Sequence, residues 1–302
     1  MNKLLNAREP AKGVGAMQVA ISMRSVHESL VQGEMSVTDF LKYAASLAVD
    51  GVELDDIYLS DANITQIREL LEETGLKVSC YDIHHGAKPT QPEDRETVLR
   101  KIKEELAVAE LLGAQHVQIV GEVFKAEVAA LDVETLISDL VEMVLPALRG
   151  SNLILAVENP ASVNFQSHQL AQLLREIGDP HVKIGFNMAN SLVAGEDPEG
   201  SLERLKEHIA HVRAVDVRLA DRDEEPQSGS YVGCVFGLGL VPLHKLFQVL
   251  QAQGYEGWIA LEFTGLEEAY FGTEASLKNL RQSLAELRHD AFHPGESTGT
   301  PL

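Results

Sequence analysis

Short apolar runs alternate with longer amphipathic stretches along this chain, and the alternation repeats about eight times. Short runs rich in β-branched residues predict strands, and apolar residues at every third or fourth position predict helices. The expected strands are Met17 to Met23, Gly51 to Leu54, Lys77 to Ile83, His116 to Val120, Leu153 to Glu158, Lys183 to Asn187, Ala214 to Leu219 and Trp258 to Phe263. The expected helices lie near Val37 to Ala48, Ile64 to Thr74, Glu93 to Leu112, Val133 to Leu148, Ser167 to Ile177, Leu202 to His208, Leu243 to Gln253 and Ser276 to Leu287.

Glycine ends several of these helices directly before the next strand, at Gly75, Gly113, Gly150 and Gly254. Glycine is the usual helix stop because it tolerates the left-handed conformation. About eight strand-then-helix units without a break in composition predict a protein of the α/β class that forms a single (β/α)8 TIM barrel. We expect an N-terminal extension over residues 1–16, the barrel over 17–288 and a C-terminal tail over 289–302.

Polar residues stand at the ends of the last four expected strands. In a parallel barrel alternate strand residues face inward, and active sites gather at the C-terminal strand ends. Glu158, Asn187 and Glu262 face inward there, and so do Asp216 and Arg218 on the expected seventh strand. These side chains are therefore predicted to meet at the mouth of the barrel.

Charge and cysteine content exclude several classes of partner. Asp and Glu outnumber Lys and Arg by 46 to 25, so the formal net charge is −21. Such a field repels nucleic acid and anionic lipid, although the same excess also serves solubility. The first fifteen residues lack the apolar core of a secretory signal, and no run is long enough to span a membrane, so a cytoplasmic location is expected. Cys80 and Cys234 are far apart and predict buried thiols.

Five segments resemble the xylose isomerase-like clan of sugar isomerases and epimerases. They are GVEL at 51–54, LAVEN at 155–159, GFNMAN at 185–190, VRLAD at 217–221, and GYEGW at 254–258 followed by LE at 261–262. The likeness extends from about Met17 to Leu287 and is strongest over the last four strands. It implies the same barrel that the periodicity predicts, and a role in carbohydrate metabolism.

The resemblance also implies a metal site, from which this sequence departs. In the clan a divalent metal is usually held by a glutamate, an aspartate, a histidine and a glutamate on strands five to eight. Glu158 and Glu262 match the glutamates, Asn187 stands at the aspartate position, and Arg218 stands at the histidine position with Asp216 as the other candidate. Asparagine offers no charge, and arginine offers only donors. We expect either a weakened metal site at Glu158, Glu262 and Asn187, or an arginine that supplies the positive charge.

Two carboxylates on opposite sides of a sugar carbon suit an isomerase or epimerase, because one removes the proton next to a carbonyl and the other returns it. The enediolate that forms needs a nearby cation. We therefore expect Glu158 and Glu262 to be the catalytic pair, and the substrate to be a sugar or a sugar-derived polyol or keto acid. The expected substrate-binding residues, with His84 at a position where clan members often contact substrate, are Arg218, Asn187, His84, Gln118 and Glu53.

Several alternatives stay open at this stage. Dehydration begins with the same proton abstraction, and loss of two metal ligands also suits a non-catalytic sugar-binding or scaffold descendant with a decayed site. Each glutamate could instead cap a helix, Arg218 could form a structural salt bridge, and His84 could be an ordinary surface histidine. An apurinic endonuclease is disfavoured because many histidines and a basic surface are missing. The segment from Asp221 to Tyr231 is expected to be a solvated loop or a lid, and a homo-oligomer is compatible with the sequence.

Overall fold

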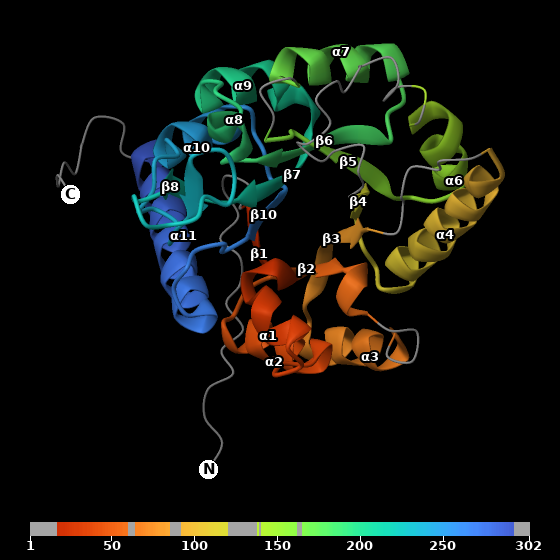
Figure 1. Ribbon diagram of the computed structural model, residues 1–302, viewed down its shortest axis with the longest axis horizontal. Coiled ribbons are helices and arrows are strands. Elements are labelled where there is room, and N and C mark those ends of the chain that lie inside the picture. The colour runs from red at the N-terminus through yellow and green to blue at the C-terminus, as the bar shows by residue number, and fades with distance from the viewer. Residues whose placement is uncertain are drawn as a thin grey trace.

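Eight parallel strands close into a barrel in this computed structural model, which describes residues 17–59, 64–84, 92–119, 138, 140–161 and 165–292. The strands neighbour one another in the order β1, β10, β7, β6, β5, β4, β3, β2 and back to β1 (Figure 1). They are β1 (Gln18–Ser22), β2 (Gly51–Asp55), β3 (Lys77–Ile83), β4 (His116–Ile119), β5 (Ile154–Glu158), β6 (Val182–Asn187), β7 (Ile209–Ala214) and β10 (Trp258–Leu261). The predicted (β/α)8 barrel is confirmed.

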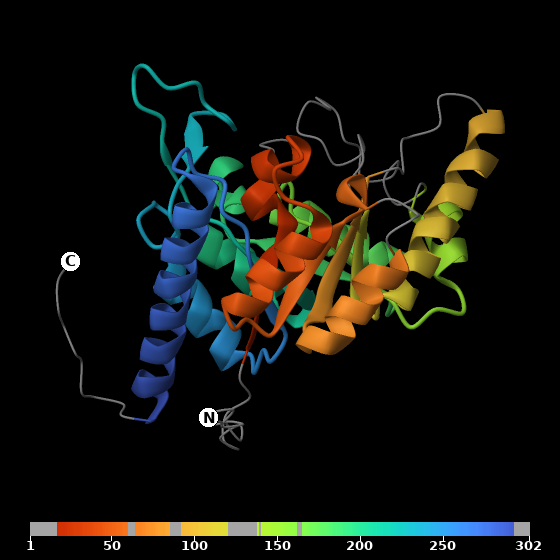
Figure 2. The same ribbon diagram turned by 90° about the horizontal axis from the view of Figure 1, so that it is seen from below.

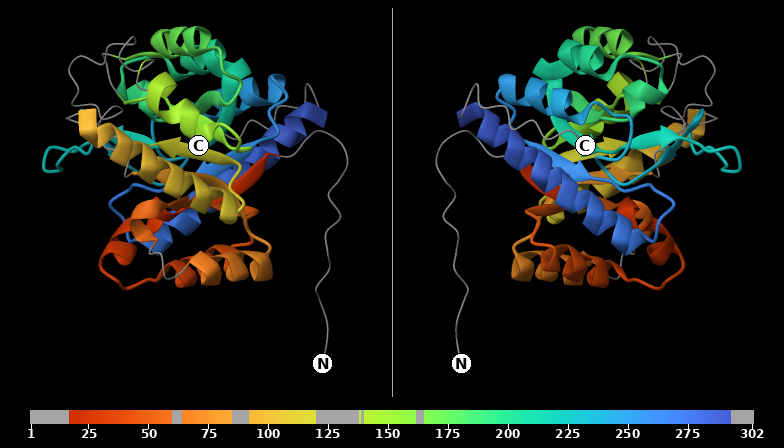
Figure 3. Two further views of the ribbon diagram at one scale, coloured as in Figure 1. Left: turned by 90° about the vertical axis from the view of Figure 1, so that its right-hand side faces the viewer. Right: turned by 90° about the vertical axis from the view of Figure 1, so that its left-hand side faces the viewer.

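Helices surround the barrel, and the views of Figures 2 and 3 show α11 lying along its outside. The helices are α1 (His27–Val31), α2 (Val37–Ser46), α3 (Ile64–Thr74), α4 (Pro92–Leu111), α6 (Leu145–Leu148), α7 (Ser167–Ile177), α8 (Asn190–Val193), α9 (Pro198–Leu205), α10 (Leu243–Ala252) and α11 (Ala269–Phe292). Short 3-10 turns are η1 (Met23–Val26), η2 (Asp56–Tyr58) and η6 (Lys206–His208), and η5 (Leu140–Val144) is a π-helical turn. No helix in the described ranges is both long and apolar enough to cross a bilayer.

The main apolar core lies between the strands and the helices, as expected when a parallel sheet is covered by amphipathic helices. In α7, for example, Leu170, Leu173 and Leu174 are buried on one face. Trp258, at the start of β10, closes the inside of the barrel at the N-terminal end of the strands. Its ring leaves no room for a side chain at Gly51, where a Cβ would lie 2.9 Å from the indole. Toward the C-terminal ends of the strands the interior becomes polar, and the strand ends carry charged side chains.

The seventh strand differs from the prediction. The barrel strand is β7, which pairs with both β6 and β10, and it places Arg213 beside Asn187 and Ala260. The expected strand from Ala214 to Leu219 is wrong. Its second half forms β8 (Val217–Leu219), which pairs antiparallel with β9 (Tyr231–Gly233) outside the barrel sheet and projects from the mouth (Figure 2). The segment expected as a solvated loop or lid connects these two strands.

Asp216 gives the physical reason for this change of direction. The buried Asp216 carboxylate accepts backbone N–H groups from Val217 at 2.9 Å, Gly237 at 3.0 Å, Gly239 at 2.9 Å and Val241 at 3.1 Å. These bonds tie the turn after β7 to the chain that follows β9. Burial raises the pKa of Asp216, and the four N–H donors oppose that rise by stabilising the carboxylate. The Asp216 carboxylate therefore stabilises the β8–β9 hairpin, and it is not part of the group of charged side chains inside the barrel.

The other expected elements agree with the structure to within a few residues. The helix expected from Leu202 to His208 corresponds to α9 and η6, and the one from Ser276 to Leu287 is part of the longer α11. Part of the helix expected from Val133 to Leu148 lies outside the described residues, as do residues 1–16 and 293–302.

Candidate functional site

Arg213, on β7, lies inside the barrel and contacts four carboxylates. Its Nε is 3.0 and 3.1 Å from the two carboxylate oxygens of Glu53 on β2. Its Nη2 bonds Asp82 Oδ2 on β3 at 2.5 Å, and its Nη1 bonds Glu158 Oε2 on β5 at 2.7 Å. Glu262, directly after β10, is the most distant, with Oε2 3.6 Å from Nε. One guanidinium thus links the ends of four strands.

The charges in this cluster do not balance. The side chain of Arg213 is 6% exposed, and those of Glu53 and Asp82 are each 1% exposed. Burial acts to lower the pKa of Arg213, and the surrounding carboxylates raise it more, so the guanidinium stays charged. Burial raises the pKa of Asp82, and Arg213 only partly opposes that shift. A single positive charge among four carboxyl groups leaves an excess of negative charge that protons or another cation must relieve.

Glu158 is held by donors on both of its oxygens. Besides Arg213, Gln118 donates from Nε2 to Oε2 at 3.3 Å, and Asn190 donates from Nδ2 to Oε1 at 3.1 Å. Asn190 is itself fixed by a second bond from Nδ2 to the backbone oxygen of Asn159 at 2.8 Å. Glu158 is therefore an oriented carboxylate whose lone pairs are largely engaged.

Glu262 has the opposite character. Its side chain is 13% exposed, and within the described part of the chain its Oε2 accepts no hydrogen bond. Burial raises the pKa of Glu262 to about 7; nearby Glu53 and Glu158 add to the rise, whereas Arg213 and Arg24 oppose it. At neutral pH this carboxyl group is therefore divided between its protonated and ionised forms, which is the property of a group that accepts and returns protons.

A second charged network lies beside the first at the barrel mouth. Arg24, in η1 directly after β1, places Nη2 3.1 Å from Asp55 Oδ2 and in contact with His84 Nε2. His84 Nδ1 lies 2.9 Å from Asp55 Oδ1 and 3.0 Å from Asp56 Oδ1. Burial acts to lower the pKa of His84, but the bonds to both aspartates outweigh it and raise the pKa to about 9. These contacts therefore join His84, Asp55, Asp56 and Arg24 in one connected network.

Arg218 does not occupy the place that the sequence suggests. Its guanidinium bonds both carboxylate oxygens of Glu224, at 2.7 and 2.6 Å, in the hairpin connection, and its side chain is 33% exposed. The prediction that Arg218 lies between Glu158 and Glu262 is wrong because the strand that carries it is not part of the barrel. A guanidinium does lie between the two glutamates, and it belongs to Arg213.

The remaining predicted residues come to the mouth with different surroundings. Glu53 and Gln118 join the cluster around Arg213, as described. Asn187 is buried: its backbone N–H donates to Asn159 Oδ1 at 2.7 Å, and its own Oδ1 accepts the backbone N–H of Ala189 at 3.1 Å. Sequence reasoning missed Arg24, Asp82 and Arg213. Signals existed for two of these three residues, since Arg24 directly follows the expected first strand and Asp82 shares the inward face of β3 with Cys80.

The side chains do not fit the divalent metal that the clan resemblance implies. Arg213 fills the space between Glu158 and Glu262 with a permanent positive charge, and the Asn187 carbonyl already accepts a backbone hydrogen bond. Two groups of three His, Cys, Asp or Glu side chains with ligand spacing exist among the described residues, and neither includes Glu158 or Glu262. Those groups are Glu53 with Cys80 and His211, and Asp55 with Asp56 and His84. Glu53 already pairs with Arg213, and His84 already bonds both aspartates.

Two cavities open at the mouth, and Glu262 lines both of them. One, of about 370 Å³, lies toward Asn187, Asn190 and the β8–β9 hairpin. The other, of about 500 Å³, lies toward Arg24 and the start of α11. Cavities of this size suit small organic ligands. A substrate at Glu262 can therefore extend to either side.

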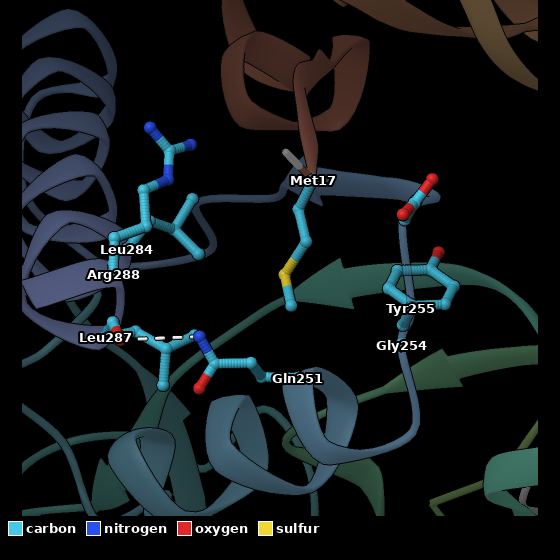
Figure 4. Close-up of a pocket in the computed structure, with 8 residues that line it drawn as sticks. Met17, Gln251, Gly254, Tyr255, Leu284, Leu287 and Arg288 are labelled. Atoms are coloured by element: carbon cyan, nitrogen blue, oxygen red, sulfur yellow. Dashed lines mark hydrogen bonds between the residues drawn. The ribbon is translucent and has the colours of Figure 1, made fainter. Parts of the chain in front are cut away.

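A third cavity, of about 170 Å³, lies away from these charges. Figure 4 shows that it is bounded by Met17, Tyr255 and side chains of α10 and α11, among them Gln251, which donates to the backbone oxygen of Leu287 at 3.3 Å. Met17 precedes β1, so this cavity is at the N-terminal end of the strands. Catalytic groups of TIM barrels gather at the opposite end.

Comparison with known proteins agrees with this architecture. An inosose dehydratase of Lacticaseibacillus casei is 29% identical over 100 residues, which make up 30% of this chain and only 33% of that relative. The probable 3-DHS dehydratase AsbF of Bacillus anthracis has a similar structure, with a TM-score of 0.70 at 16% identity over 88% of this chain and 99% of that one. The 3-keto-D-glucoside 4-epimerase of E. coli gives a TM-score of 0.62 at 18% identity over 90% of this chain and 99% of its own.

At such identities the structural likeness concerns the fold. A family model described as xylose isomerase-like TIM barrel, however, matches residues 41–288, which is most of the chain. Together with the closed barrel, this match shows that the chain belongs to the xylose isomerase-like TIM barrel family.

Proposed function

We propose that this protein is an enzyme that removes a proton next to the carbonyl of a small sugar or sugar-derived ketone, and that it completes an isomerisation or epimerisation. The observation that carries the proposal is the placement of Glu158 and Glu262 on either side of Arg213 at the barrel mouth. The proteins that this chain resembles include an inosose dehydratase, a probable 3-DHS dehydratase and a 3-keto-D-glucoside 4-epimerase, which supports a small, sugar-related substrate.

Glu262 is the residue to which we assign proton abstraction. Its side chain borders both cavities, and its pKa of about 7 makes the carboxylate a stronger base than an ordinary glutamate while leaving much of it ionised at neutral pH. The carboxylate takes the proton, the C–H electrons form a carbon–carbon double bond, and the carbonyl electrons move to oxygen. The product of this step is an enediolate.

The return of the proton decides the product. Delivery to the neighbouring carbon isomerises the substrate, and delivery to the opposite face of the same carbon epimerises it. Glu158, across Arg213 from Glu262, is the group we assign to the opposite face. Arg213 keeps the two carboxyl groups apart and partly neutralises both.

Dehydration is the second candidate, and one observation favours it. Both oxygens of Glu158 accept hydrogen bonds, whereas Glu262 keeps an oxygen without one within the described residues. The site therefore suits a reaction that uses a single base. In dehydration Glu262 would take the proton next to the carbonyl and give it to the hydroxyl that leaves from the adjacent carbon, so that water and an unsaturated ketone form.

The test is loss of substrate C–H signals in deuterated water, followed by proton NMR. An inosose, a 3-keto-D-glucoside and a simple ketohexose serve as probes, and Glu262→Gln is the negative control. We expect exchange with at least one probe, and we expect it to survive dialysis against EDTA because the site does not fit a divalent ion. An unsaturated product would identify dehydration, and a rearranged or epimerised sugar would identify the first candidate.

Absence of exchange with every probe would contradict the proposal. Calorimetric binding of a probe without exchange would favour the non-catalytic sugar-binding descendant instead. Loss of exchange on treatment with EDTA, restored by a divalent ion, would contradict the assignment of positive charge to Arg213.

A further inference from the structure

We propose that Arg24, and not Arg213, binds the carbonyl oxygen of the substrate and stabilises the negative charge that develops there. This inference rests on the proposed function, because it assigns a partner to the oxygen that becomes negative when Glu262 removes the proton. The two guanidinium groups near Glu262, those of Arg24 and Arg213, differ in how many of their donors are engaged.

Arg213 is committed to the protein. Its Nε, Nη1 and Nη2 all donate to carboxylates, and its side chain is 6% exposed beneath the mouth. To bind a substrate oxygen strongly it would have to give up a buried charged partner, which is costly because the carboxylate left behind would stay desolvated. Its role is to hold the cluster together.

Arg24 is available where Arg213 is not. Its side chain is 30% exposed and lines the cavity of about 500 Å³ that Glu262 also lines. Its ion pair with Asp55 and its contact with His84 both involve Nη2, and the described residues provide no hydrogen-bond partner for Nε or Nη1. Arg24 therefore keeps donors for a ligand while one end of its guanidinium is anchored.

The anchoring makes Arg24 suitable for catalysis. The Asp55 carboxylate, 3% exposed at its side chain, pairs with Nη2 at 3.1 Å, and Asp55 is itself held by His84 Nδ1 at 2.9 Å. A donor whose position is fixed before the reaction stabilises developing charge without the cost of reorienting. A planar guanidinium can also donate to two oxygens at once, such as the carbonyl and hydroxyl oxygens of an enediolate.

The cavity also contains other charges that limit what it binds. Glu28, Glu267 and Glu268 line it together with Arg24 and Glu262. Arg24 supplies the one guanidinium among the described lining residues, so a neutral hydroxyketone with its carbonyl at Arg24 fits this lining better than a substrate with several negative charges.

The experiment compares Arg24→Gln and Arg24→Lys with Arg218→Gln, using the proton exchange described above and the probe that the wild-type protein exchanges fastest. Arg218 pairs with Glu224 in the hairpin and lines neither mouth cavity, so it controls for loss of an arginine. We expect Arg24→Gln to lower kcat for exchange by roughly 10²- to 10³-fold, the usual effect of removing one oxyanion donor. Arg24→Lys keeps the charge but not the fork, and we expect a loss of about tenfold.

Chemical rescue separates binding of the oxygen from support of the fold. Added guanidinium ion at a concentration below that which unfolds the protein should restore part of the rate to Arg24→Gln and should not affect Arg218→Gln. If Arg24→Gln does not fold, as judged by circular dichroism, the folded Arg24→Lys variant decides, and a wild-type rate in that variant would overturn the inference.

The outcomes distinguish the two proposals. No exchange by the wild-type protein with any probe overturns the proposed function and this inference together. Exchange by the wild-type protein that is equally fast in Arg24→Gln and Arg218→Gln overturns only the role of Arg24. A loss in Arg24→Gln that guanidinium rescues supports both.

Discussion

Removal of Arg213 should destabilise the barrel more than any other single change in the site. In Arg213→Gln the buried carboxylates of Glu53 and Asp82, each 1% exposed at the side chain, lose their cation, and Glu158 loses its shortest hydrogen bond. Removing one partner of a buried ion pair costs roughly 3–5 kcal/mol. We expect the free energy of unfolding to fall by about that amount, because the abandoned carboxyl groups can take up protons and so avoid a larger cost.

The same reasoning predicts the pH dependence of the loss. Without Arg213 the pKa values of Asp82 and Glu262, which burial already raises, rise further in the folded state, so the folded state binds more protons than the unfolded state over a wider range. The stabilising effect of those protons disappears as the pH rises, and the variant should therefore lose more stability above neutral pH than below it.

Equilibrium unfolding in urea, at one pH below and one pH above the value of about 7 at which Glu262 titrates, measures this difference. Arg218→Gln is the matched control, since that arginine pairs with Glu224 on the exposed hairpin, and its unfolding midpoint should hardly change. A loss for Arg213→Gln below about 1 kcal/mol, a typical value for an unremarkable substitution, or a loss that does not grow with pH, would refute the view that Arg213 is an indispensable counter-ion.

Three further predictions concern Glu262 and Asp216. Glu262→Gln should lower the rate of proton exchange by about 10²- to 10⁴-fold, the range for loss of a general base, and a rate within threefold of the wild type, roughly the scatter of ordinary mutational effects, would contradict its role. In the wild-type protein the exchange rate should rise as the pH increases through about 7, because the base must be ionised. Protein stability should fall over the same interval, because the pKa of Glu262 in the folded state lies above its ordinary value of 4.5. The proton that stabilises the folded state is fully bound below pH 4.5 and is lost near pH 7. Urea unfolding of Glu262→Gln at both ends of the interval should lack this component, and an unchanged pH slope would count against it. Asp216→Asn replaces a carboxylate that accepts four backbone N–H groups, and we expect it to lower the free energy of unfolding by about 1–3 kcal/mol. The variant should also expose the β8–β9 hairpin to limited proteolysis. Resistance to protease equal to that of the wild type would show that these bonds do not hold the hairpin.

The barrel could be predicted from the sequence because each strand and helix is specified mostly by residues that are neighbours along the chain. Each strand from β1 to β6, and β10, is a short apolar run bounded by turn residues, and the helices between them have a clear apolar face, as in α7. Glu158 and Glu262 could be placed at strand ends for the same reason, since parity along a strand decides which side chains face inward.

The seventh strand could not be placed in this way. From Ile209 to Leu219 two short runs of alternating polar and small or apolar residues stand on either side of Ala214 and Val215, so the pattern does not tell which run closes the barrel and which forms the hairpin. Two arginines, Arg213 and Arg218, stand in similar local surroundings. What separates them is long-range: pairing of β7 with β6 and β10, and the capture of Asp216 by backbone N–H groups some twenty residues further on. The charged partners of Arg213 on β2 and β3 depend on the same closure.

The position of Arg213 also explains why Glu262 can act as a base at neutral pH. A divalent ion would bring two positive charges to the carboxyl groups at the mouth, whereas Arg213 brings one and shares it among Glu53, Asp82 and Glu158 through hydrogen bonds. Glu262 receives the smallest part of that charge, because it is the most distant at 3.6 Å and its Oε2 has no hydrogen bond within the described chain. The unneutralised charge of the cluster, added to burial, therefore raises the pKa of Glu262 to about 7. On this view an arginine between the two glutamates does not mark a decayed site, since its single charge leaves Glu262 as the proton acceptor that the proposed reaction requires.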